Sequence, residues 1–139
     1  MVRLIIGAKG KGKTTVIHDR ANAAMKDAKG SVVYIDRNSK HMYELSNKIR
    51  LIDISQYPIK NSDQFVGFIC GITSQDHDIE ELYLDGFLDC AKTTPADSLA
   101  TIRQLDDISS KNNIKITISL TADADDLPDE LKSMIDVAL

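Results

Sequence analysis

The fold of this chain is decided by residues 2–15, VRLIIGAKGKGKTT, where an apolar run passes directly into a loop rich in glycine and lysine. Val2–Ile6 is predicted to be a buried β-strand. The glycines of the loop let the backbone curl, so that its N–H groups can converge on an anion. A helix is expected from Lys13 to about Ala28, and its N-terminus points free N–H groups and a positive dipole at the same place. The stretch therefore predicts a strand–loop–helix unit that binds phosphate.

The loop matches the P-loop pattern G-x-x-x-x-G-K-[ST] at every position. Its residues are Gly7, Ala8, Lys9, Gly10, Lys11, Gly12, Lys13 and Thr14, with Thr15 following them. In this pattern Lys13 bridges the outer phosphates of a nucleotide, and Thr14 places its hydroxyl on Mg²⁺. We expect these residues to bind ATP, or another nucleoside triphosphate, with Mg²⁺. ATP is the default because the chain has no guanine-specific N/TKxD motif. A chance glycine-rich turn is the alternative, against which the flanking strand and helix argue.

Strand and helix signals alternate along the rest of the chain, which predicts a parallel sheet covered by helices. The expected strands are Val2–Ile6, Ser31–Asp36, Ile49–Ile54, Glu81–Asp85, Ile114–Leu120 and Asp136–Leu139. Later helices are expected after Ser62 as N-cap, after Thr94 as N-cap with Pro95 in the first turn, and near Pro128. No linker or change of composition divides the chain, so residues 1–139 are expected to form a single domain.

A second acidic site is expected at Asp85, because a P-loop site needs a carboxylate for the water shell of Mg²⁺. Asp85 ends an apolar run, as a Walker B aspartate does, although a turn aspartate before Gly86 is the alternative. Many ATPases carry glutamate directly after this aspartate, and here Gly86 stands there. A catalytic base must then come from elsewhere. Asp36 is our first choice, since strand ends line the crevice of open α/β sheets, but a plain turn residue is an equally good interpretation.

Other polar residues have weaker claims to a role. Asp53 and Asp89 are further candidates for the base, and Thr121 could contact the γ-phosphate or cap a turn. Arginine-finger candidates are Arg37, Arg20 and Arg103, for each of which a solvated surface charge is the simpler interpretation. His18 is expected on the exposed side of the first helix. Cys70 and Cys90 are expected to be buried, reduced thiols.

Composition limits the classes of function. The chain has 139 residues, 42% hydrophobic and 27% charged, with a formal net charge of −4, which is typical of a globular protein. The acidic balance argues against nucleic-acid partners and anionic membrane surfaces. The sequence contains neither a signal-peptide pattern nor a span of membrane length. We therefore expect a cytoplasmic protein, whose partners are a nucleoside triphosphate and either another protein or copies of itself.

The chain resembles the RecA-like branch of the P-loop NTPase superfamily and, more loosely, the core of type II thymidine kinases. The matching features are the P-loop, Tyr34-Ile35-Asp36-Arg37, Leu84-Asp85, and the run from Ile116–Leu120 to Asp123–Asp126. The resemblance implies a three-layer α/β/α sandwich with a mostly parallel sheet of strand order 3-2-4-5-1-6. The chain departs from the thymidine kinases, which carry a cysteine-bound zinc domain, a lasso segment and glutamate after the Walker B aspartate.

Three functions fit these features. The first is a P-loop protein that binds Mg-ATP and hydrolyses it slowly or only with a partner. The second is a module that senses nucleotide without hydrolysing it. The third is a nucleoside or small-molecule kinase, which needs a pocket for the phosphate acceptor.

Overall fold

The structure is a computed structural model that describes residues 1–139. Its six strands form one parallel sheet in the order β3-β2-β4-β5-β1-β6, which confirms the order and direction expected from the sequence. The strands are β1 Val2–Gly7, β2 Ser31–Asp36, β3 Arg50–Asp53, β4 Ile79–Leu84, β5 Lys115–Thr121 and β6 Ile135–Ala138. All strands run the same way, so the residues that follow them gather at one edge of the sheet.

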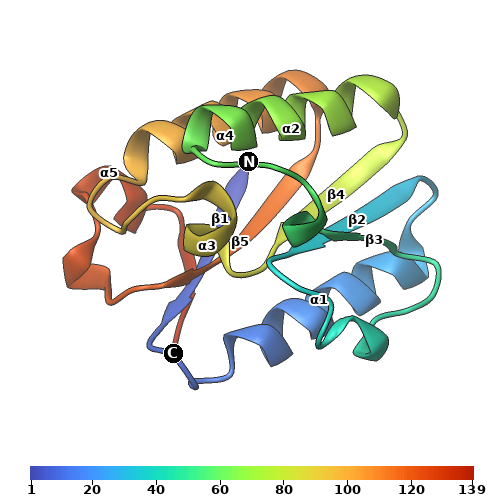
Figure 1. Ribbon diagram of the computed structural model, residues 1–139. Helices are drawn as coiled ribbons and strands as arrows, with labels where there is room; N and C mark the ends of the chain where they lie inside the picture. Colours follow the sequence, from blue (N-terminus) through green and yellow to red (C-terminus); the bar gives the residue numbers. More distant parts are fainter.

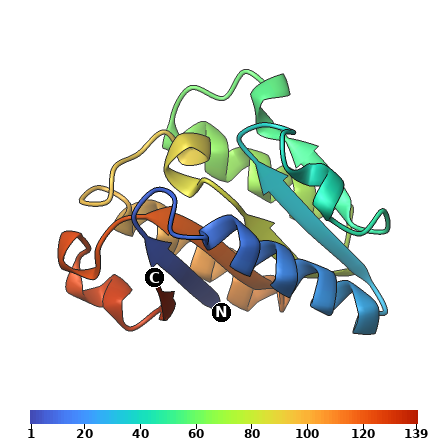
Figure 2. The same cartoon turned by 90° about the horizontal axis from the view of Figure 1, so that it is seen from below.

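Helices cover both faces of the sheet and complete three layers (Figures 1 and 2). Helix α1 lies on one face, and α2 and α4 lie side by side on the other. The α-helices are α1 Lys13–Asp27, α2 Ser62–Gln75, α3 Phe87–Ala91, α4 Leu99–Asn112 and α5 Asp129–Lys132. Three short 3₁₀ helices are η1 Met42–Glu44, η2 Ile54–Gln56 and η3 Ala124–Asp126. None of these helices combines the length and the apolarity needed to cross a membrane.

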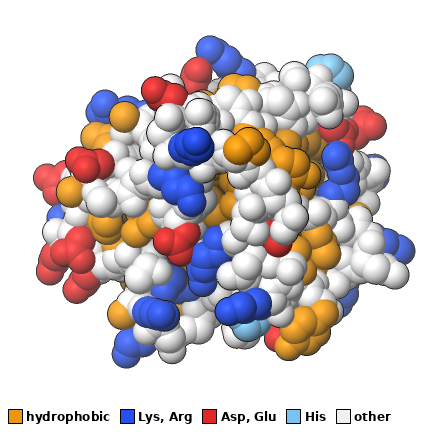
Figure 3. Space-filling model, viewed as in Figure 1, with side chains coloured by type: hydrophobic (Ala, Val, Ile, Leu, Met, Phe, Trp, Pro, Cys, Tyr) orange, Lys and Arg blue, Asp and Glu red, His pale blue; other side chains and the backbone are white.

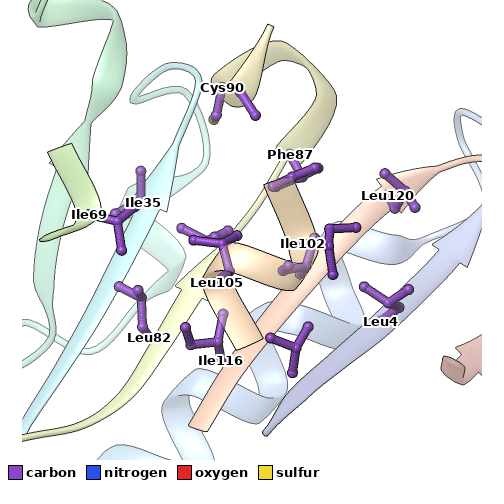
Figure 4. Close-up of a cluster of buried hydrophobic side chains, with 14 of the residues drawn as sticks. Leu4, Ile35, Ile69, Leu82, Phe87, Cys90, Ile102, Leu105, Ile116 and Leu120 are labelled. Atoms are coloured by element: carbon purple, nitrogen blue, oxygen red, sulfur yellow. The ribbon is translucent and has the colours of Figure 1, made fainter. Parts of the chain in front are cut away.

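The hydrophobic core has two parts, one on each face of the sheet. The larger part packs beneath α2 and α4, and Figure 4 shows Ile102 and Leu105 of α4 directed at the sheet. The smaller part packs against α1. In β1, Leu4 belongs to the larger part and Ile5 to the smaller, because successive side chains of a strand point to opposite faces. Burial on both faces explains why inner strands such as β1 and β2 are mostly continuous apolar runs.

Two helix starts differ from the prediction. The N-cap of α2 is Asn61 rather than Ser62, and its side chain accepts a hydrogen bond of 2.8 Å from the backbone N–H of Gln64. Helix α4 begins at Leu99, not near Pro95. The side chain of Thr94 caps only a separate turn, in which it accepts the N–H of Asp97 at 3.3 Å. The predicted cap of α2 was thus one residue too late, and the cap at Thr94 was real, but a local capping pattern does not show whether a helix or a single turn follows.

Two side chains lie in environments opposite to those expected. His18 is buried, because η1 folds back over α1 and the Glu44 carboxylate shares a 2.9 Å hydrogen bond with Nδ1 of His18. Its ring also packs edge-on against Tyr34, with centroids 5.2 Å apart. Cys70 is exposed on the outer side of α2, whereas Cys90 is buried as predicted. The segment that covers His18 comes from residues 37–48, the part of the sequence with the weakest structural signal.

Candidate nucleotide site

The loop between β1 and α1 forms an open concave turn. Gly10 and Gly12 have φ angles of +81° and +95°, which residues with a Cβ rarely adopt. A Cβ at either position would meet no atom within 4 Å, so the space next to these two glycines is clear of protein. Helix α1 starts directly after Gly12 with neither a side-chain cap nor an acidic residue in its first turn. Its first N–H groups are therefore available to an anion.

Lys13 is folded back over the loop that precedes it. Its Nζ donates hydrogen bonds to the backbone oxygens of Gly7 at 2.9 Å and Ala8 at 3.0 Å. Burial lowers the pKa of Lys13, the negative charge of Asp85 opposes that shift, and the positive charge of Arg37 adds to it. The ammonium group thus stands at the mouth of the loop beside a second cation.

Asp85 follows β4 and is the centre of a buried hydrogen-bond network. One carboxylate oxygen accepts the hydroxyl of Tyr34 at 2.8 Å and that of Thr14 at 3.2 Å. The other accepts the hydroxyl of Ser119 at 2.6 Å, and Ser119 in turn accepts the N–H of Gly86 at 2.9 Å. The structure therefore brings together the two residues that the sequence predicted for the metal, Thr14 and Asp85.

Tyr34 and Ser119 were not foreseen as site residues. Each lies in a strand next to β4, and the phenol of Tyr34 has its pKa raised by burial and then by Asp85. A weak signal was available for Ser119, which is a polar residue inside the apolar run of β5. Nothing near Tyr34 in the sequence distinguishes it from an ordinary strand tyrosine. Only the strand order places both hydroxyls on Asp85.

A polar cavity of about 310 Å³ lies at the centre of these groups. No hydrophobic residue lines it. Its lining residues are Lys9, Gly10, Gly12, Lys13, Thr14, Thr15, Arg37, Asp85, Gly86, Ser119 and Thr121. Gly7, Ala8 and Lys11, which the sequence also predicted for nucleotide binding, belong to the loop but do not line the cavity. Such a lining suits a charged, strongly hydrated group more than an apolar ligand.

Asp36, the predicted base, lies at the end of β2 but does not line this cavity. Its carboxylate is buried and accepts the backbone N–H of Arg37 at 2.7 Å. Burial, followed by the nearby charge of Asp85, raises the pKa of Asp36 to about 6. Arg37, the residue that follows Asp36, does line the cavity.

Of the other residues considered in the sequence, Asp53 and two arginines lie outside the cavity. Asp53 accepts the N–H of Ser55 at 3.0 Å and so caps η2. Arg20 pairs with Asp136, and Arg103 with Glu130, and neither arginine lines the cavity. Thr121 lines the cavity from the end of β5.

The oxygen ligands at Thr14 and Asp85 fit a magnesium ion, which prefers hydroxyl, carboxylate, water and phosphate oxygens. No group of three or more His, Cys, Asp or Glu side chains could hold a metal ion by itself. A metal here would therefore depend on oxygens that a bound phosphate and water supply.

Charge is unevenly distributed over the face seen in Figure 3. Lys and Arg side chains gather at its centre, beside exposed hydrophobic side chains, while Asp and Glu gather at the left over η3 and α5. Although the net charge is −4, the polar cavity is lined by three cations, Lys9, Lys13 and Arg37, and one carboxylate, Asp85.

The fold is shared with a solved structure. The flagellar accessory protein FlaH from Methanocaldococcus jannaschii superposes with a TM-score of 0.63 at 13% sequence identity. The match covers 95% of this chain and 65% of FlaH, so the chain spans less than two thirds of that protein's length. No protein-family model and no curated protein matches the sequence. The likeness assigns the chain a RecA-like α/β fold and does not bear on the resemblance to thymidine kinases.

Proposed function

We propose that this chain binds a nucleoside triphosphate, by default ATP, with Mg²⁺, and that it hydrolyses the nucleotide slowly or only with a partner. One observation carries the proposal, which is the open, left-handed glycine loop whose lysine and threonine meet Asp85 across a purely polar cavity. In this arrangement the loop N–H groups and Lys13 bind the phosphates, while Thr14 and Asp85 hold Mg²⁺ directly or through water.

Slow hydrolysis is expected because no catalytic base is in place next to Asp85. Gly86 has no side chain to orient an attacking water, and Asp36, the predicted base, lies outside the cavity lining. A positioned base contributes about 10²–10⁴-fold to a rate, and an arginine supplied in trans about 10³–10⁵-fold. A protein partner or a second copy of the chain could supply either group, as happens in many P-loop enzymes.

The test is a thermal-shift assay with ATP, ADP and GTP, each with and without Mg²⁺. At free ligand near 100 times Kd, binding stabilises a protein by about 2.7 kcal/mol. Lys13→Ala should abolish the shift. Lys26→Ala is the matched control, because Lys26 is exposed in the last turn of the same helix and should leave the shift intact. The proposal is wrong if millimolar nucleotide leaves the melting temperature of the wild type unchanged.

A kinase is the second candidate, favoured by a cavity of about 590 Å³ beside the polar one. Its walls mix charged, polar and apolar residues, as the binding site of a small organic acceptor does. They comprise Arg37, Asn38, Ile54, Ser55, Tyr57, Ile59, Leu88, Asp89, Cys90, Lys92 and Thr93. Labelled ATP incubated with a panel of nucleosides separates the candidates. Phosphate transferred to a nucleoside supports the kinase, whereas phosphate released to water supports the NTPase.

A further inference from the structure

Arg37 lies where three cavities of the protein meet. Its side chain lines the polar cavity, the cavity of about 590 Å³, and a third cavity of about 350 Å³ between them. No other residue lines all three. A long cation at this place can contact a ligand in the polar cavity and change the shape of the neighbouring one.

Gly86 leaves the space that Arg37 occupies. A Cβ built on Gly86 would lie 2.0 Å from Nη1 and 3.1 Å from Cζ of Arg37, so the guanidinium rests on the bare Cα. Gly86 also has a φ of +67°, which disfavours any other residue. Many ATPases carry a glutamate side chain at the position of Gly86. Here the side chain of Arg37, which follows β2, fills that space directly beside Asp85.

The present partner of Arg37 is a weak one. Nε of Arg37 lies 3.5 Å from the carboxylate of Asp89, and the two side chains are 43% and 69% exposed. A single exposed contact at this distance stabilises little. A phosphate in the cavity would offer the guanidinium two parallel charge-assisted hydrogen bonds, which are stronger and more directional.

The positive charges around the cavity also favour the binding of an anion. Burial lowers the pKa of Lys13, the charge of Asp85 raises it, and the charge of Arg37 lowers it, so the two cations repel each other although Asp85 attracts Lys13. Lys9 lines the same cavity. The terminal phosphate of a bound triphosphate is the group whose charge would relieve this repulsion.

We propose that Arg37 is a terminal-phosphate contact supplied by the chain itself, which leaves Asp89 for the γ-phosphate and so signals the state of the nucleotide to the 590 Å³ cavity. The inference rests on the nucleotide binding proposed above. It predicts discrimination between triphosphate and diphosphate, which the P-loop alone does not require.

The test measures the affinities for ADP and for a non-hydrolysable ATP analogue by calorimetry, both with Mg²⁺. Arg37→Ala should weaken analogue binding about 10- to 100-fold, the range expected for a hydrogen bond to a charged group. Its affinity for ADP should change less than about twofold, which also shows that the variant is folded. Asp89→Asn should tighten analogue binding, because Arg37 is then free. Arg103→Ala removes another exposed, ion-paired arginine and is the matched control.

The outcomes separate the two proposals. Equal losses for ADP and the analogue in Arg37→Ala, or no loss for either, would overturn the role of Arg37 and leave the nucleotide site standing. If the wild type binds neither ligand, both proposals fall.

A fluorescence reporter tests the link to the larger cavity. The chain has no tryptophan, and Tyr57 lines that cavity together with Arg37. In Tyr57→Trp, emission should change with the ATP analogue and stay constant with ADP. The change should disappear when Arg37→Ala is added, and its persistence there would show that Arg37 does not link the two cavities.

Discussion

Three charged side chains set the chemistry of the site: Asp36 and Arg37 at the end of β2, and Asp85 directly after β4. Asp85 accepts hydrogen bonds from hydroxyl groups of three other elements, whereas the buried side chain of Asp36 accepts only one hydrogen bond, from the backbone N–H of Arg37. An ionised carboxylate that is well hydrogen-bonded tolerates burial, and one that is poorly bonded resists it. The two aspartates should therefore respond differently to substitution.

Asp36 should make the stability of the protein depend on pH. Its pKa of about 6 in the folded state lies above the ordinary value of 3.8, so between these values the folded protein binds more protons than the unfolded chain. Stability from this group therefore falls as pH rises through that window. Asp36→Asn carries no charge and should be more stable than the wild type by about 3 kcal/mol near neutral pH.

Urea denaturation from about pH 4 to about pH 8 measures this difference. The two stability curves should meet at the acid end and separate as pH rises through the window above. Parallel curves would show that Asp36 titrates normally. If Asp36 is also the catalytic base, the same variant loses hydrolysis while its affinity for ATP changes little.

Asp85→Asn should weaken nucleotide binding in the presence of Mg²⁺ more than in its absence, because an amide oxygen holds the metal less well. Tyr34→Phe is the comparison, since it removes one hydrogen bond to Asp85 and leaves the Asp85 carboxylate and the Thr14 hydroxyl in place. It should cost about 1 kcal/mol of stability and leave the Mg²⁺ dependence unchanged. Equal losses with and without Mg²⁺ in Asp85→Asn would assign Asp85 a structural role alone.

Among the helices and strands, starting points matter because the site is assembled where elements begin and end. Helix α1 starts without a side-chain cap and faces the cavity, whereas α2 starts with the Asn61 cap and lies away from it. A capped N-terminus has already satisfied one of its free N–H groups. The contrast is consistent with α1 keeping its N–H groups for a ligand.

Asn61→Ala should therefore destabilise the protein by about 1 kcal/mol, the usual cost of losing an N-cap. Asn61→Asp keeps an oxygen that accepts the Gln64 N–H, and should retain full stability. Chemical denaturation of both variants measures the effect. If the two variants lose the same stability, the cap hydrogen bond contributes nothing to α2.

For the protein as a unit, the RecA-like sheet carries a polar cavity at the ends of its strands, and Gly86 follows Asp85 where many ATPases carry glutamate. We expect the isolated chain to hydrolyse ATP well below about 10 s⁻¹, the median rate of enzymes. Activity per chain should rise with protein concentration if a second copy supplies the missing group. Phosphate release measured over a range of concentrations tests this, and fast turnover that is independent of concentration would contradict it.

Local patterns were sufficient for much of this protein. The strand–loop–helix unit at the N-terminus, the alternating strands and the position of Asp85 after an apolar strand follow from residue type and spacing over short stretches, and the strand order follows from the resemblance to RecA-like proteins. The folded chain decided the rest, including the hydroxyl groups on Asp85, the burial of His18, and the guanidinium of Arg37 on Gly86. These contacts join side chains far apart in sequence, whose meeting depends on the register of neighbouring strands and the path of loops, and no short stretch of sequence records either.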